Sequence, residues 1–403
     1  MTPAPFAAFD ANAAPTASPR SSAPDTDRFE IVADPAALEA LRPEWDALYE
    51  RAAQPYFSQS FSWCWTSWQT VSRPRGRRLH CVIARRGSRI VLIWPFVIHR
   101  LGAWSVVRPL GPETSEYSDV LVEEGAQAAA RIAAAWKILR RTCQCDIITL
   151  PLVRSGSGLH LILSEEVAPA FVETDPTSYV RWANYKDWQD YERSLGSETR
   201  RVIRRRRRRL QEKGELIFEP VVEPAQSSAV IDWVLREKKD RLARTNLRNH
   251  WMHTPEYRAF LMKMAATPQP ASGILIAVLR LSGQIIAAQV HRVDRVRVEG
   301  LIPVFDPAFA AYGLGQILQE ECLKWAFTQG RDYDLRLGKQ PHKEIWVNGS
   351  CDVISYEFGN SRWGRFYVLY RNAAQGLSRL RYWVPPEWRR KIKAALGRGA
   401  QRH

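Results

Sequence analysis

Strands and helices are predicted in the same order in both halves of the chain. In the first half, the β-rich runs "LHCVIARR" and "RIVLIWPFVIH" flank a Gly87-Ser88 turn, and a helix and the buried-looking strand "CDIITLPLV" follow. In the second half, helices precede three strands within residues 273–306, and a helix closed by Gly330 and the strand "DYDLRLG" follow. This order predicts an α/β (α+β) fold of two similar modules, each a mixed, mostly antiparallel sheet flanked by helices. Because no internal sequence repeat is visible, the prediction rests on element order alone.

The length of 403 residues suits two domains. We place the N-terminal module at residues 28–175 and the C-terminal module at residues 176–372. Residues 1–27 are rich in Ala, Pro and Ser, which is typical of a disordered tail. Residues 373–403 are predicted to form a basic, amphipathic tail interrupted by Pro385-Pro386.

The net charge of +16 favours anionic partners, namely nucleic acid, acidic lipid headgroups or phosphorylated cofactors. The N-terminus lacks a basic start followed by an apolar run, and the longest apolar stretch, residues 90–98, is far shorter than the roughly 20 residues of a membrane span. Six scattered cysteines indicate no disulfide framework. We therefore expect a cytoplasmic protein, with peripheral contact at the inner membrane as the alternative location.

Two short motifs offer metal ligands. Cys143 and Cys145 form one pair, and His250 and His253 form the other. A structural zinc site needs four ligands with supporting spacing, so we predict no metal.

The stretch from Val296 to Lys324 has the strongest features of a binding site. A predicted strand is followed by Gly313-Leu314-Gly315, which opens a helix. Glycines let the backbone approach a ligand, and a helix N-terminus offers free N–H groups and partial positive charge to a pyrophosphate. The alternative is an ordinary turn between a strand and a helix.

A second candidate stretch is "YDLRLGKQPHKEIW". Asp334 ends a strand, Gly338 turns the chain, and Lys343 and Trp346 follow. Charged groups at the end of a strand often face a ligand. The alternative is a salt-bridged surface loop.

An arginine-rich helix is predicted from residue 198 to residue 213, with Ser197 as its N-cap. Its apolar stripe consists of Val202, Ile203 and Leu210, and helical spacing places Arg206 inside that stripe. Neighbouring like charges repel each other, so a bound anion would offset their cost. The alternative is a solvated basic helix paired with nearby acids.

Four segments together resemble the GNAT-type acyltransferase domain of the CelD/BcsL cellulose-biosynthesis-associated proteins, which are relatives of the FemAB group. They are "PYFSQSFSWCWTSW", "SLGSETRRVIRRRRRRLQEKG", "FDPAFAAYGLGQIL" and "YDLRLGKQPHKEIW", and the resemblance covers about residues 28–372.

The resemblance implies two GNAT-like modules that transfer an acyl group from acetyl-CoA or another acyl-CoA to an amine or a hydroxyl. It implies that the CoA pyrophosphate is bound by Gly313, Leu314, Gly315 and Gln316. The matching substrate-binding positions are Arg200, Arg201, Arg204, Lys343 and Trp346. The chain departs from the family pattern at two positions, since His342 replaces a tyrosine and Leu314 replaces a proline.

We therefore predict an acyl-CoA-dependent acyltransferase connected with exopolysaccharide or cell-envelope biosynthesis. His342, Glu299 and Asp334 are the candidate proton acceptors. Backbone N–H groups near residues 299–302 would polarise the thioester carbonyl of the acyl donor. The predicted acceptor is a small molecule, a sugar or an amine. One alternative is a FemX-like transferase that uses aminoacyl-tRNA. Another is a non-catalytic partner of a polysaccharide synthase at an anionic membrane.

Overall fold

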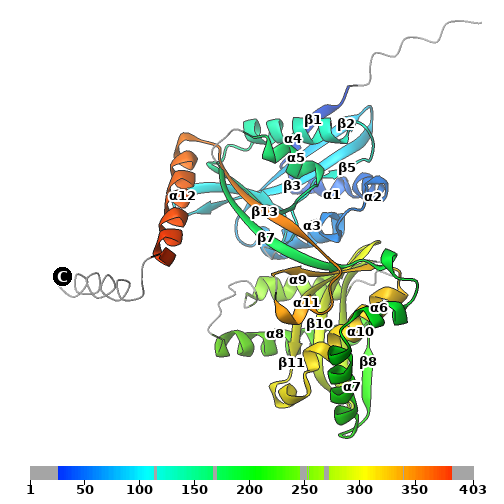
Figure 1. The fold of residues 1–403 in the computed structure, drawn as a ribbon. Helices are drawn as coiled ribbons and strands as arrows, with labels where there is room; N and C mark the ends of the chain where they lie inside the picture. Colours follow the sequence, from blue (N-terminus) through cyan, green and yellow to red (C-terminus); the bar gives the residue numbers. More distant parts are fainter. Residues whose placement is uncertain are drawn as a thin grey trace, which may run out of the picture.

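The computed structural model describes residues 26–112, 116–166, 170–245, 252, 254–266, 272–338 and 340–383. Within these ranges, thirteen strands form one mixed, mostly antiparallel sheet flanked by helices (Figure 1). The strands of the first half are β1 (Arg28–Val32), β2 (Arg78–Arg86), β3 (Arg89–Leu101), β4 (Trp104–Pro109), β5 (Leu121–Val122), β6 (Ile147–Arg154) and β7 (Ala170–Val180). The strands of the second half are β8 (Leu216–Glu219), β9 (Gly273–Leu281), β10 (Gln284–Val293), β11 (Arg297–Phe305), β12 (Asp332–Leu337) and β13 (Gly349–Gly359).

The strand order is β1-β2-β3-β4-β6-β13-β7-β12-β11-β10-β9-β8, with β5 paired to β3. Among the described strands, β4 pairs with β6, and β11 with β12, in parallel. The predicted strands within residues 273–306 are confirmed as β9, β10 and β11. The turn between β9 and β10 has positive φ angles at Ser282 and Gly283, the conformation that a tight hairpin requires.

Strand β13 connects the two halves of the sheet. It pairs antiparallel with β6 on one side and with β7 on the other, although it follows β7 by about 170 residues in the chain. Figure 1 shows β7 and β13 side by side between the upper and lower lobes. The predicted module boundary after residue 175 falls inside β7, so the division at this residue stays a prediction.

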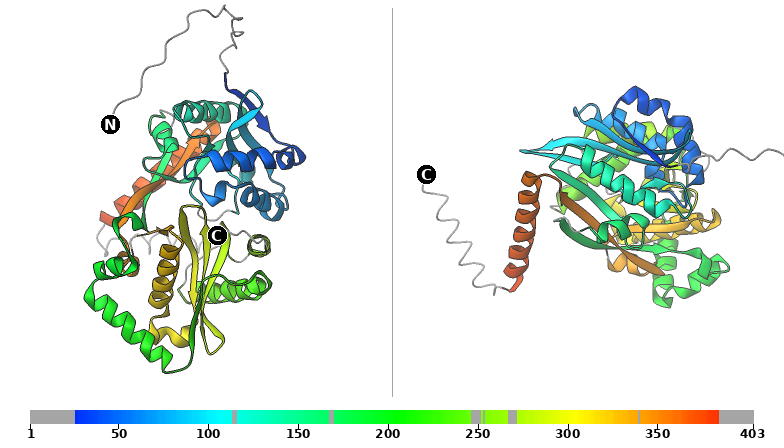
Figure 2. Two further views of the ribbon diagram at one scale, coloured as in Figure 1. Left: turned by 90° about the vertical axis from the view of Figure 1, so that its right-hand side faces the viewer. Right: turned by 90° about the horizontal axis from the view of Figure 1, so that it is seen from above.

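Helices cover the sheet in both lobes (Figures 1 and 2). Those of the first half are α1 (Pro35–Ala40), α2 (Arg42–Arg51), α3 (Phe61–Ser67), α4 (Ala128–Thr142) and α5 (Gly158–Ser164). Those of the second half are α6 (Trp188–Ser194), α7 (Ser197–Gln211), α8 (Pro224–Arg244), α9 (Pro255–Ala265), α10 (Leu314–Thr328), α11 (Pro341–Glu344) and α12 (Arg362–Trp383). Short turns of other helix types are η1 (Phe57–Gln59), η2 (Trp68–Ser72), η3 (Trp182–Asn184) and η5 (Pro307–Tyr312).

A hydrophobic cluster between the lobes contains tryptophans of α3 and η2. Trp63 and Trp68 are buried, and the ring centroid of Trp63 lies 4.8 Å from that of Phe260 in α9. The first half therefore packs on the second through apolar contacts as well as through the sheet.

The arginine-rich segment is a helix, as predicted, and Ile203 and Leu210 of its apolar stripe are buried. The predicted cap is wrong. Gly196 occupies the N-cap position in an extended conformation, and Ser197 is the first helical residue and makes no capping hydrogen bond. The helix nevertheless packs on the protein, because its apolar stripe belongs to the hydrophobic core of the second half of the sheet.

The remaining predictions concern the tails and a metal. Helix α12 crosses the predicted start of the C-terminal tail at residue 373, and residues 1–25 and 384–403 lie outside the described ranges. His250 and His253 also lie outside them. Over the described ranges, no three His, Cys, Asp or Glu side chains are grouped as metal ligands. None of the described helices combines the length and the apolar character needed to span a bilayer.

Candidate active site

Strands β11 and β12 pair over only three residue pairs, Arg297–Asp332, Val298–Tyr333 and Glu299–Asp334. A cavity of about 630 Å³ opens where this pairing ends. It is lined by β11 from Gly300 onward and by β12 from Leu335 onward. Irregularities in both strands lie at this point, since the register of β11 against β10 shifts beside Gly300 and Arg336 has a φ of 62°. The strands therefore separate at the point where the cavity opens.

The start of α10 forms one wall of the cavity. Gly313 precedes the helix with φ 61° and ψ 44°, a left-handed conformation that favours glycine. Gly313, Gly315 and Gln316 line the cavity, whereas Leu314 points into the core and is buried. The first N–H groups of a helix have no partner within it and carry partial positive charge. The four predicted cofactor residues thus form one turn, of which three members face the cavity.

Arg206 reaches this turn from α7. Its guanidinium donates a hydrogen bond to Oε1 of Gln316, and a β-carbon placed on Gly313 would lie 2.6 Å from its Nη1 atom. The neighbouring Arg207 pairs with Glu320 and Glu321 of α10. The described residues include no carboxylate paired with Arg206, so its positive charge is uncompensated beside the positive end of α10.

The predicted substrate-binding arginines lie elsewhere on α7. Arg201 pairs with Glu198 at 2.7 Å and Arg204 with Glu192 at 3.0 Å, and both arginine side chains are mostly exposed. Arg200 is half-buried, and none of the three lines the cavity. The structure therefore brings Arg206, rather than Arg200, Arg201 or Arg204, to the predicted pyrophosphate turn.

Helix α11 and the residues after it form the opposite wall. His342, Lys343 and Trp346 all line the cavity. Partial burial lowers the pKa of His342, and the charges of Lys343 and Arg241 lower it further, so the imidazole is neutral at physiological pH. Lys343 donates from Nζ to the carbonyl of Leu337 at 2.5 Å, and burial lowers its pKa. The three residues of this sequence motif therefore lie together at one cavity, and their roles stay predictions.

Glu299 is held in a buried ion-pair network outside the cavity lining. Its carboxylate accepts hydrogen bonds from Arg292 at 2.6 Å and from Arg336 at 2.9 Å. Burial acts to raise the pKa of Glu299, but the attraction of Arg292 and Arg336 outweighs it and holds the pKa below its usual range. A carboxylate bound by two guanidinium groups is a poor proton acceptor.

Asp334 belongs to the same network. Its Oδ1 atom accepts from the hydroxyl of Tyr117 at 3.0 Å and from the backbone N–H of Arg336 at 2.6 Å, and its other oxygen pairs with Arg154. It does not line the cavity. Of the three predicted proton acceptors, His342 alone faces the cavity.

Helix α8 contributes residues that the sequence analysis did not select. Lys238, Arg241 and Leu242 line the cavity, and the guanidinium carbon of Arg241 lies 5.6 Å from the ring centroid of Phe305. Burial, and then the charge of Arg241, lowers the pKa of Lys238 to about 8. Residues three and four positions apart share one face of a helix, so the sequence alone predicts that these three side chains lie together.

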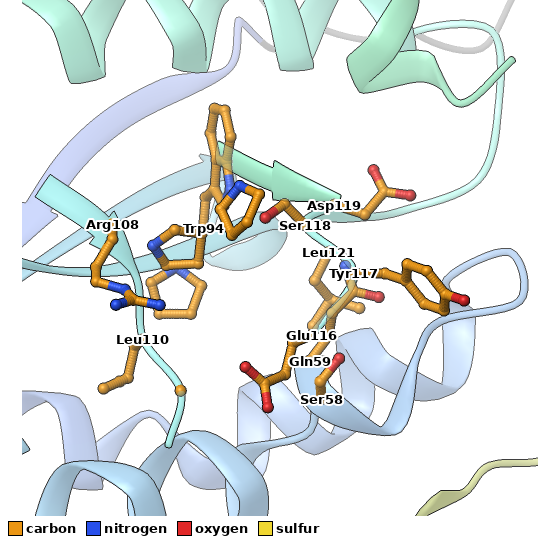
Figure 3. Close-up of a pocket in the computed structure, with 14 residues that line it drawn as sticks. Ser58, Gln59, Trp94, Arg108, Leu110, Glu116, Tyr117, Ser118, Asp119 and Leu121 are labelled. Carbon is orange, nitrogen blue, oxygen red and sulfur yellow. The ribbon is translucent and has the colours of Figure 1, made fainter. Parts of the chain in front are cut away.

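A second pocket lies in the first half of the chain and is lined by η1, by β3 and β4, and by residues between β4 and β5. Figure 3 shows Arg108 and Glu116 approaching it from different sides, with the Trp94 side chain above them. Burial raises the pKa of its lining residue Asp119 to about 6. The pocket holds about 40 Å³, room for a few water molecules but not for a coenzyme.

Comparison with known proteins finds a matching domain family over part of the chain. Residues 197–344 match the family model of the acetyltransferase (GNAT) domain. The fold is GNAT-like. The matched residues include α7, the α10 turn and His342, and every lining residue of the large cavity except Trp346. No curated protein matches the chain significantly.

Two solved structures share the fold at low sequence identity. The structure of FemX is 9% identical, covers 82% of this chain and 98% of its own, and has a TM-score of 0.56. The C-terminal domain of a protein described as a lysylphosphatidylglycerol synthetase from Agrobacterium fabrum is 12% identical, covers 83% and 96%, and has a TM-score of 0.50. At these identities the likeness concerns the fold alone.

Proposed function

We propose that the protein is an acyltransferase that takes its acyl group from an acyl-CoA bound in the cavity between β11 and β12. The observation that carries this proposal is the meeting of the separated strands with the α10 turn, where Gly313, Gly315 and Arg206 lie together inside the region matched by the GNAT domain.

The charges of the cavity support a polyanionic donor. Lys238, Arg241 and Lys343 line it, together with Arg336, whose charge is paired with the buried Glu299, and the described lining residues include no aspartate or glutamate. An electropositive cleft attracts phosphate groups and raises their rate of association. A volume of about 630 Å³ lies within the range of small-molecule and cofactor sites, which is roughly 300–1,000 Å³.

The positions of these residues define one orientation for a bound CoA. Its pyrophosphate would lie at the N-terminus of α10 against Arg206, and its thioester would lie between the strands near Gly300. Backbone N–H groups of β11 in the stretch 300–302, beyond its pairing with β12, would donate to the thioester carbonyl oxygen.

The chemistry then requires a proton acceptor and a nucleophile. An amine or hydroxyl of the acceptor attacks the carbonyl carbon, the carbon–sulfur bond breaks, and CoA leaves as a thiolate. His342 accepts the proton that the nucleophile loses, directly or through water, because its imidazole is neutral. The proton returns to the thiolate or to solvent. By the sequence resemblance, the acceptor is a sugar or a small amine in cytoplasmic steps of exopolysaccharide biosynthesis.

Calorimetry with acetyl-CoA tests the binding site. Gly315 lies at the cavity, and a β-carbon there meets no atom within 4 Å, so Gly315→Ala is a matched control that preserves the turn. Gly315→Glu adds a negative charge where the pyrophosphate is expected and should reduce affinity at least tenfold. Equal affinity of the two variants would refute this placement. Thiol release over a panel of acyl-CoAs and amino-sugar acceptors then tests the reaction, and its absence with every pair would favour a non-catalytic role.

A second candidate function is transfer from an aminoacyl-tRNA. Its specific support is the outer face of α7, where Arg205 and Arg208 are exposed and no described carboxylate pairs with them. Such a face suits the phosphates of RNA, and its binding would weaken steeply with salt. Replacing Arg205 and Arg208 by Gln should weaken tRNA binding, whereas the same change at the exposed Arg42 and Arg73 in the first half should not. Acyl-CoA turnover without tRNA binding would exclude this candidate.

A further inference from the structure

The outward side of α12 exposes large apolar side chains to solvent. Trp363, at 51% exposure, is the least exposed of the four, and Tyr370, at 69%, is the most exposed. We name these four residues the aromatic face: Trp363, Phe366, Leu369 and Tyr370. At 3.6 residues per turn they share one stripe of the helix, the side on which a helix in water normally carries polar residues.

The opposite side of α12 is already fixed to the protein. Val368 is fully buried, and a β-carbon on Gly364 would lie 1.8 Å from the carbonyl oxygen of Asp146. The hydroxyl of Ser361 donates to Asp146 at 2.6 Å, and Arg371 pairs with Glu357 of β13. The helix therefore cannot rotate to hide its aromatic face without breaking these contacts.

The aromatic face lies at the edge of the molecule. Figure 2 shows α12 standing outside the sheet, and Figure 1 shows it on the side of the upper lobe away from α7 and α10. The tip of the neighbouring β3–β4 hairpin adds Leu101, which is also exposed, and Trp104, whose ring stacks on Trp363 with centroids 5.9 Å apart. The apolar surface thus continues from α12 onto the hairpin.

The charges around this surface are positive. The sequence of α12 contains five arginines and no lysine, aspartate or glutamate. Arg362 and Arg365 are exposed on α12 itself. A second copy of the chain would bring two such basic surfaces together, which like-charge repulsion opposes. An anionic bilayer complements the charge and also accepts aromatic side chains at its headgroup level.

We propose that the aromatic face of α12 binds the surface of an anionic membrane. In this arrangement Phe366, Leu369 and Tyr370 enter the headgroup region, and Arg362 and Arg365 contact lipid phosphates. The helix lies along the membrane rather than across it. This binding is separate from acyl transfer, because the face contains no residue of the cavity.

Sedimentation with vesicles tests the proposal on the full chain. Phe366, Leu369 and Tyr370 are replaced together by Ser, and Trp363 is kept because it packs on Trp104. The control replaces two other exposed apolar residues, Leu161 and Ile217, by Ser. The vesicles contain phosphatidylcholine with phosphatidylglycerol, or phosphatidylcholine alone.

We expect the natural protein and the control to bind the anionic vesicles, and the triple variant to bind at least tenfold more weakly. Raising sodium chloride from about 0.05 M to about 0.5 M should weaken the binding, because salt screens the charges. If the triple variant folds poorly, Tyr370→Asp alone should still reduce binding, since this side chain is mostly exposed. Unchanged binding of both variants would overturn the proposal. A dimer that dissociates in the variants, without vesicle binding, would overturn it in favour of an interface between copies.

Discussion

The Arg206 side chain fills the space beside Gly313, where a β-carbon would lie 2.6 Å from its Nη1 atom and 2.9 Å from its Cδ atom. The arginine run therefore meets the predicted cofactor turn through one particular residue. Arg207 beside it is neutralised by two glutamates of α10, and Arg201 and Arg204 by glutamates at the surface. Arg206 has no carboxylate partner among the described residues and donates to Gln316.

Replacing Arg206 by Gln should weaken CoA binding about 10- to 100-fold. The basis is the loss of a charge-assisted hydrogen bond, which contributes roughly 1.5–3 kcal/mol. Calorimetry with CoA measures this change, and pantetheine, which has no phosphate, should bind the variant and the natural protein equally. Arg208→Gln on the exposed face is the control and should leave CoA affinity unchanged. An equal loss for pantetheine would mean that Arg206 only supports the turn.

Replacing Gly313 by Ala should destabilise the protein by about 1–2 kcal/mol from the left-handed conformation alone. The added methyl group also pushes against Arg206, so CoA affinity should fall together with stability. Urea unfolding measures the first effect and calorimetry the second. Gly315→Ala, which meets open space, should cost far less. Equal stabilities of the two variants would contradict the expectation that the left-handed conformation at Gly313 disfavours alanine.

The element order of the fold is readable from local patterns, because alternation and helical spacing reflect which side of a strand or helix is buried. The β9–β10 hairpin and α7 follow from such signals. The insertion of β13 between β6 and β7 does not, since strand pairing across about 200 residues depends on the whole sheet. The same pairing explains why a boundary drawn at residue 175 cuts through β7.

Sequence patterns bring together those cavity-lining residues that are close in sequence. The α10 turn and the segment with His342, Lys343 and Trp346 are of this kind. Asp334 is a candidate because charged groups at strand ends often face ligands, and Glu299 because it lies beside the backbone groups expected to polarise the thioester. Their oxygens are instead bound by Arg292, Arg336 and Arg154, which come from distant parts of the chain. Local patterns carry no information about such partners.

Lys238 should make CoA binding depend on pH. With a pKa of about 8, its amine is mostly charged at pH 7 and mostly neutral at pH 9. Since only the charged form attracts phosphate, CoA affinity should fall several-fold as the pH rises through this range. The variant Lys238→Met should bind more weakly at pH 7 and show a flatter pH dependence. If the variant retains the full pH dependence, another group causes it.

His342→Gln should lower kcat about 10²- to 10⁴-fold, the usual contribution of a general base. In the natural protein, kcat/KM should rise with pH as His342 loses its proton, with the midpoint of the rise below the ordinary histidine pKa of 6.5, because burial and neighbouring cations lower its pKa. The variant should lack this rise of kcat/KM at acidic pH. His160→Gln, in the first half of the chain, is the control and should keep it. If the rise of kcat/KM at acidic pH persists in His342→Gln, another residue accepts the proton.

Glu299→Gln should impair folding rather than the chemical step. Removing one partner of a buried ion pair costs about 3–5 kcal/mol, a large share of the stability of a domain, because Arg292 and Arg336 would lose their counter-charge. Glu198→Gln breaks the exposed pair with Arg201 and should cost less than about 1 kcal/mol.

The pH dependence of unfolding gives the second measurement for Glu299. Its pKa is lower in the folded protein than in the unfolded chain, so its stabilising contribution is complete above the ordinary value of 4.5 and is lost as the pH falls through the lower folded value. Urea unfolding from pH 7 to pH 3 should show this loss in Glu198→Gln and a smaller one in Glu299→Gln. If Glu299→Gln instead remains as stable as the control and loses only kcat, Glu299 acts in catalysis and His342 is not the sole proton acceptor.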